Sequence, residues 1–101
     1  MNKTYLEQEI YKKVGESMKD YRDALDLSRD SFLQKMDDCK LRHKKDKDFF
    51  SIAFETLKGY ENGVRECPVS KFFIIAILLN MDLNELKKKI QNVYKIEPIT
   101  K

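Results

Sequence analysis

Residues that interrupt helices are rare in this chain. It contains three glycines and two prolines among 101 residues, and no proline precedes Pro68. An all-β fold needs many tight turns, and glycine and proline are among the residues that usually form them. Long stretches without either residue favour helices instead. The composition, 42% hydrophobic and 37% charged, is that of one small soluble domain. We therefore predict an all-α fold.

The first half of the chain predicts two helices. Thr4 and Glu7 have the spacing of a capping box, in which a hydroxyl and a carboxylate each bond a free backbone N–H. Apolar residues then recur at steps of three and four, as on one face of a helix: Leu6, Ile10, Val14, Met18, Tyr21 and Leu25. Gly15 lies within this pattern, where the helix could kink or divide in two. Ser28 is placed to cap a second helix, whose buried side would be Phe32, Leu33 and Met36.

The second half predicts three shorter helices. Ser51 is placed to cap a third helix over residues 52–60, and Asn62-Gly63 supplies the turn that ends it. Pro68 then suits the start of a fourth, very apolar helix. Asp82 and Glu85 repeat the capping-box spacing and open a fifth helix. The inward residues of this last helix are predicted to be Leu83, Leu86, Ile90 and Val93.

These elements predict a compact bundle of about five helices in a single domain, residues 1–95. Residues 39–50 have no clean period and are predicted to form an insertion between the second and third helices, as a loop or as an irregular helical extension. Pro98 ends regular structure, which leaves residues 96–101 as a C-terminal tail. From residue 94 onward, disorder and pairing as a short strand are both open alternatives.

Positive charge is concentrated in the inserted loop. The protein carries a net charge of +3, and residues 40–48 alone account for it, with five basic side chains against two aspartates. Any anion-binding face is therefore expected to be local. The five cations are Lys40, Arg42, Lys44, Lys45 and Lys47. The alternative is a solvated loop without a binding role.

Side chains suited to catalysis or metal binding are too few for a site. Cys39 and Cys67 lack metal-ligand spacing and are expected to be reduced thiols, and His43 is the only histidine. There is no nucleophile beside a base and no glycine-rich phosphate loop. We therefore expect no enzymatic activity, no cofactor and no bound metal.

The chain also lacks the features of a membrane protein or a secreted protein. Its N-terminus has no apolar segment of the signal-peptide kind. The longest apolar run, residues 72–79, has eight residues, whereas a membrane span needs about 20. We expect a cytoplasmic protein with no membrane contact.

The order of motifs after residue 50 resembles a known DNA-binding family. A polar helix, the YENG turn at residues 60–63, Pro68, an apolar helix and a capped final helix follow one another at family-like spacing. Together with Val14-Gly15, Leu27-Ser28 and Phe32, they resemble the lambda-repressor-like helix-turn-helix family, of the Cro and xenobiotic-response-element type. The resemblance implies sequence-specific binding to duplex DNA by a small transcriptional regulator, such as a phage or plasmid repressor.

The chain departs from this family in three places. About 14 extra residues, near 37–50, separate the second and third helices, which the family joins by a short turn. Arg29 stands where the family usually has a glutamine-like residue. The predicted outward positions of the third helix offer few hydrogen-bond donors to base edges. These positions are Phe54, Glu55, Lys58 and Gly59. We therefore predict that the inserted loop is a basic arm that replaces the missing contacts.

The resemblance and the charge pattern together predict the residues of a DNA-binding site. Lysine and arginine supply phosphate contacts, and side chains of the third helix would contact phosphates or bases. The predicted DNA-binding residues are Arg29, Lys40, Arg42, Lys44, Lys45, Lys47, Phe54, Glu55, Thr56, Lys58, Asn62 and Arg65.

The predicted fourth helix is apolar on every side, which is unusual for a surface helix of a small domain. We predict that it forms a homodimer interface, because a twofold dimer also suits DNA half-sites. The predicted interface residues are Phe72, Ile74, Ile77 and Leu78. The alternative is that residues 5–13 fold back over this helix. A second function is also open: a protein-interaction module, such as an antirepressor or accessory factor, that binds another regulatory protein and little DNA.

Overall fold

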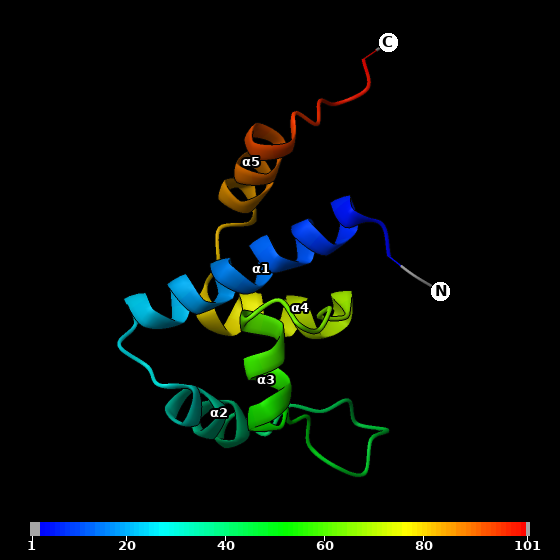
Figure 1. The fold of residues 1–101 in the computed structure, drawn as a ribbon. Coiled ribbons are helices and arrows are strands. Elements are labelled where there is room, and N and C mark those ends of the chain that lie inside the picture. The colour runs from blue at the N-terminus through cyan, green and yellow to red at the C-terminus, as the bar shows by residue number, and fades with distance from the viewer. Residues whose placement is uncertain (1–2, 101) are drawn as a thin grey trace.

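Five α-helices and no strand form residues 3–100, the part of the chain that the computed structural model describes (Figure 1). The helices are α1 (Tyr5–Ala24), α2 (Arg29–Asp38), α3 (Phe54–Glu61), α4 (Val69–Leu79) and α5 (Leu83–Tyr94). This architecture confirms the predicted all-α bundle. Residues 39–53, between α2 and α3, contain only turns, bends and irregular chain, so the insertion is a loop and not a helical extension. Residues 96–100 are irregular as well, so the tail does not pair as a strand. Residues 1–2 and 101, the outer ends of the predicted domain and tail, lie outside the described chain.

The capping box predicted at the start of α1 is present. Glu7 N donates to Thr4 Oγ1 at 3.2 Å, and Thr4 N donates to Glu7 Oε1 at 3.0 Å. These bonds satisfy two N–H groups that have no partner within the helix. The bonds from the Thr4 backbone and hydroxyl also lower the pKa of Glu7, because they favour its charged form.

Gly15 does not divide α1, which is one helix of 20 residues. The glycine is needed for packing instead. A Cβ atom at this position would collide with the carbonyl oxygen of Tyr60 and would lie 3.0 Å from that of Glu61. Both carbonyls belong to the last turn of α3, so α1 crosses the end of α3 with the two backbones in close contact (Figure 1). Any side chain larger than that of glycine would separate the two helices.

The third helix begins later than predicted. α3 starts at Phe54, its N-cap is Ala53, and no side chain caps it, so the predicted cap at Ser51 is wrong. Ile52 explains the delay, because this residue lies in irregular chain before the helix and its side chain is buried in the core. The hydrophobic contact of Ile52 therefore outweighs the local preference of Ser51 for a cap position.

A tyrosine from α1 takes part in the cap of α5. Asp82 accepts from the backbone N–H groups of Asn84 and Glu85, as predicted. The Glu85 carboxylate does not return to the Asp82 N–H. Instead the Tyr21 hydroxyl accepts from Asp82 N at 3.1 Å and donates to Glu85 Oε2 at 2.7 Å. Tyr21 thus joins α5 to α1, and its bond to Glu85 raises the pKa of the phenol.

The core lies among the first four helices. The largest fully buried side chains, one from each of α1 to α4, are Met18, Met36, Leu57 and Ile75. From α5 only Leu86 is buried. Two of the residues predicted to point inward, Leu83 and Val93, are exposed, and Ile90 is half-buried. The reason is visible in Figure 1, where α5 projects away from the other helices and lacks a neighbour along most of its length.

Candidate nucleic-acid interface

The inserted segment between α2 and α3 is held in shape by its own hydrogen bonds. We call residues 40–50 the basic loop. Its two ends are joined by the bond from Phe50 N to Leu41 O, at 2.6 Å. Within the loop, Arg42 Nη1 donates to the carbonyl oxygens of Asp46 and Lys47, at 2.9 and 3.3 Å. The Asp46 carboxylate accepts from His43 N. The loop therefore has a defined conformation, and it projects from the body beside the start of α3 (Figure 1).

The cations of the basic loop have two different roles. Lys40 and Arg42 lie over the ring of Phe49, with the Lys40 Nζ 5.3 Å and the Arg42 Cζ 5.1 Å from its centroid. Such cation–π contacts, with the bonds of Arg42 to carbonyl groups, stabilise the loop. Lys44, Lys45 and Lys47 are exposed, and none of them forms an ion pair with a carboxylate of residues 3–100. These three ammonium groups are free to bind an external anion.

The outward face of α3 is small. Phe54, Glu55 and Lys58 are exposed, and Thr56 is half-buried. Gly59, predicted to face outward, is buried, because the aliphatic part of the Arg65 side chain covers it. Arg65 itself is exposed and so is Asn62, the C-cap of α3. The helix thus brings few polar side chains to its surface, and most of the nearby positive charge comes from the basic loop.

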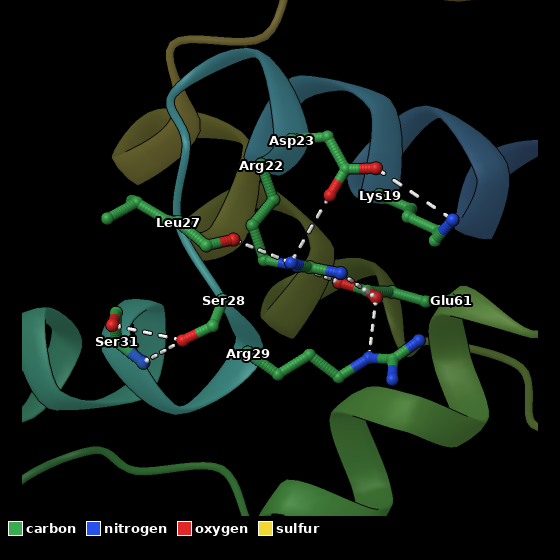
Figure 2. Close-up of polar contacts among 8 residues, drawn as sticks. All are labelled: Lys19, Arg22, Asp23, Leu27, Ser28, Arg29, Ser31 and Glu61. Carbon is green, nitrogen blue, oxygen red and sulfur yellow. Dashed lines mark hydrogen bonds and ion pairs between the residues drawn. The ribbon is translucent and has the colours of Figure 1, made fainter.

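A buried cluster of charges fixes the positions of α1, α2 and α3 (Figure 2). We call Arg22, Arg29 and Glu61 the Glu61 clamp. Arg22 donates to both carboxylate oxygens of Glu61, through Nε and Nη2, each at 2.8 Å. Arg29 Nε donates to Glu61 Oε1, also at 2.8 Å. Only 1% of the Glu61 side chain is exposed. The hydrogen bonds from Arg22 to Glu61 raise the pKa of this arginine, because they favour its charged form.

The clamp also reaches the chain between α1 and α2. Arg22 Nη1 donates to the carbonyl oxygen of Leu27 at 2.6 Å (Figure 2). One guanidinium group therefore joins the end of α1, the turn into α2 and the last residue of α3. Every buried polar atom of these side chains has a partner, which a buried ion pair requires to be tolerated.

Sequence reasoning missed the clamp. Glu61 was interpreted only as part of a turn, and Arg29 as a phosphate contact, whereas the Nε of Arg29 is bound to Glu61. One signal was present in the sequence. Arg22 follows Met18 by four residues, so both lie on the buried face of α1, where a charged side chain requires a partner.

The exposed side of α4 carries an apolar stripe. Val69, Phe73 and Ile77 are exposed and follow one another at steps of four, and we call them the α4 stripe. Of the four predicted interface residues, Ile77 is the most exposed, at 75%, and Ile74 is half-buried. The other two, Phe72 and Leu78, pack against the core. Residues 5–13 are part of α1 and leave Ile77 uncovered, so the fold-back alternative does not hold for Ile77.

Three further observations concern the thiols, metal binding and membrane spans. Cys39 and Cys67 are free thiols, and burial raises the pKa of Cys67 to about 11. Among residues 3–100 no group of three histidine, cysteine, aspartate or glutamate side chains is arranged to hold a metal ion. No helix in this range combines the length and apolar character that crossing a bilayer requires.

Comparisons with known proteins were made in three ways. Neither the protein-family models, nor the curated proteins, nor the solved structures gave a match. The resemblance to the lambda-repressor-like family therefore rests on the residues and motifs of this chain alone, and it stays a prediction.

Proposed function

We propose that this protein binds duplex DNA as a small transcriptional regulator, with the basic loop and the start of α3 as its contact face. The observation that carries the proposal is the ordered loop beside α3, with exposed Lys44, Lys45 and Lys47 and no internal carboxylate paired to them. Lysine contacts to phosphates supply much of the affinity of DNA-binding proteins. Any preference for particular duplex sequences would come from the polar side chains Thr56 and Lys58 on α3.

Preorganisation supports this proposal. A loop that is already held by internal bonds loses less conformational freedom on binding than a flexible arm does. The Glu61 clamp fixes α2 relative to α3, so that Arg29 and the start of α3 keep a constant spacing. The terminal nitrogens of Arg29 have no bond to Glu61, and the half-buried side chain can still contact a phosphate.

Replacing Lys44 and Lys45 by alanine is expected to weaken DNA binding. The affinity for a duplex of arbitrary sequence should fall about 10-fold at low salt, and the slope of log K against log salt should decrease by about 1.8, which corresponds to two lost phosphate contacts. Gel-shift titrations over a range of salt concentrations would measure both quantities.

The matched control replaces Lys87 and Lys88, two exposed lysines of α5, by alanine. α5 and the basic loop lie at opposite ends of the molecule in Figure 1, so this variant should bind as the parent protein does. If the loop variant and the control have equal affinity and equal salt dependence, the basic loop is not the contact face.

The α4 stripe favours a second candidate function, the binding of another polypeptide. A homodimer formed through this stripe would serve either role, because a twofold dimer can contact two DNA half-sites or present a doubled surface to a regulatory protein. Each isoleucine buried in such an interface stabilises it by roughly 1.5–3 kcal/mol. A module that has kept the fold but binds only protein would show the dimer without DNA binding.

Replacing Phe73 and Ile77 by lysine is expected to convert a dimer into a monomer. Two charges in the interface should raise the dissociation constant by roughly 100-fold or more, since the apolar contacts are lost and the lysines repel one another. Light scattering coupled to gel filtration would give the mass. Val64→Lys is the control, because Val64 is also 75% exposed but lies outside the α4 stripe. If the parent protein is a dimer and the double variant has the same mass, the dimer forms through another surface. A monomeric parent protein would contradict the proposed interface.

A further inference from the structure

Two phenylalanine rings are exposed in the most basic region of the molecule. Phe49, the next-to-last residue of the basic loop, is 48% exposed. Phe54, the first residue of α3, is 37% exposed. Their neighbours Phe50 and Ile52 pack against the core or lie within it. The exposed rings are not needed to fill the interior. Because these rings lie in a basic segment, they are suited to an anionic ligand that also has planar groups.

We propose that this face binds unpaired nucleic-acid bases, with Phe49 and Phe54 as stacking partners and the loop lysines as phosphate contacts. The inference rests on the proposed function, since it uses the same loop, and it names the form of nucleic acid that the face prefers. Proteins that bind single strands combine a positively charged surface with aromatic side chains on which bases stack. Both components are present within residues 40–58.

The chemistry of α3 favours stacking over groove reading. Phenylalanine cannot donate a hydrogen bond to a base edge, and a carboxylate such as Glu55 can only accept one. Stacking requires neither, because every base has a π-face. Lys40 and Arg42 already lie over the ring of Phe49, so a base at this position would displace one of them or stack on the outer plane of the Arg42 guanidinium.

The spacing of the two rings suits a single strand. They are five residues apart in sequence, so their Cα atoms are separated by at most about 18 Å. The exposed lysines of the loop, Lys44, Lys45 and Lys47, lie in the chain just before Phe49, and Lys58 follows Phe54 by one turn of α3.

The test compares single-stranded and duplex DNA with the full chain. The probes are fluorescently labelled oligothymidylate of about 20 nucleotides, which exceeds one site of single-strand binding, and a mixed-sequence duplex of the same length. The variants are Phe49→Leu and Phe54→Leu, which keep the apolar volume but remove the π-face. Each is expected to lower the affinity for oligothymidylate about 10-fold, within the range known for base–aromatic stacking, and to lower the affinity for the duplex by a clearly smaller factor.

Two controls separate stacking from general effects. Tyr5→Leu removes an exposed ring from the first turn of α1, outside the basic loop and α3, and should leave both affinities unchanged. Phe49→Trp retains a π-face and should bind oligothymidylate at least as tightly as the parent protein. Circular dichroism would confirm that each variant is folded.

The outcomes distinguish the two proposals. If both leucine variants bind oligothymidylate as the parent does, while duplex binding still depends on Lys44 and Lys45, the stacking proposal is overturned and the proposed function stands. If the parent protein binds neither probe at low salt, both proposals are overturned. A loss of oligothymidylate binding that is restored by Phe49→Trp supports stacking.

Discussion

Gly15→Ala is expected to destabilise the protein by about 3 kcal/mol, although alanine is the better helix former by about 1 kcal/mol. The added methyl group would collide with the carbonyl oxygen of Tyr60 and press against that of Glu61. Both are backbone atoms in the last turn of α3, so they cannot move aside without separating the two helices. The free energy of unfolding in urea would measure the effect, and a decrease of roughly 1–2 M in the midpoint is expected.

Gly59→Ala is the matched control, because it adds the same methyl group to another buried glycine in a helix. The nearest atoms there, at 3.0 to 3.4 Å, all belong to the flexible side chain of Arg65. This side chain can shift into solvent, so the gain in helix propensity should offset the contact and leave stability within about 1 kcal/mol of the parent. Equal stability of the two alanine variants would contradict the close crossing of α1 and α3.

Glu61→Ala is expected to destabilise the protein by about 3–5 kcal/mol. The substitution leaves the buried guanidinium of Arg22 without its partner, and an uncompensated buried charge is strongly unfavourable. It also removes the bond to Arg29, which holds the start of α2 to the end of α3. Unfolding in urea, followed by circular dichroism, would measure the loss.

The control for this variant is Glu66→Ala. Glu66 pairs with Lys3 at 2.9 Å, but both side chains are largely exposed. Solvent screens such a pair, so its removal should change the free energy of unfolding by no more than the error of the measurement. A double variant adds a stricter test: combining Arg22→Met with Glu61→Gln should cost less than the sum of the single effects, because the two side chains act as one unit. Additive losses would mean that the clamp residues act independently.

These two predictions concern the same region. Gly15 allows the close approach of α1 to α3. Two helical turns further along α1, Arg22 of the Glu61 clamp fixes the orientation of α1 relative to α3. If the basic loop and the start of α3 form the binding face, this region keeps that face in a fixed relation to α2. Substitutions in this region would then weaken binding through loss of structure. Substitutions of the loop lysines would weaken binding without changing the free energy of unfolding. Stability and binding measured on the same variants separate the two effects.

The features that sequence reasoning predicted correctly are local ones. The caps at Thr4, Ser28 and Asp82 were found because the partners in each cap are two to three residues apart. The lack of an apolar period set residues 39–50 apart from the regular helices, but it left a loop and an irregular helical extension both open. The start of α3 was missed, since burial of Ile52 outweighed the cap preference of Ser51. Hydrophobic contact with distant residues is not visible in a short window of sequence.

The candidate site was predicted in part. The exposed lysines of the basic loop lie where their charge pattern placed them, on the surface beside α3. Three predicted members also make internal contacts: Arg29 binds Glu61, and Lys40 and Arg42 lie over the exposed ring of Phe49. Whether a side chain points outward depends on which helix lies next to it, and this choice is made only when the elements pack.

The amino-acid sequence by itself determined where the five helices form and where the chain's positive charge gathers, because caps, apolar periodicity and charge runs act between residues close in the chain. Only the tertiary structure decided the partner of Arg22, the need for glycine at position 15 and the exposure of α5. Arg22 and Glu61 are 39 residues apart, and no local rule selects one carboxylate among many. The choice follows from burial, since a charge removed from water must find a partner where the packed helices place one.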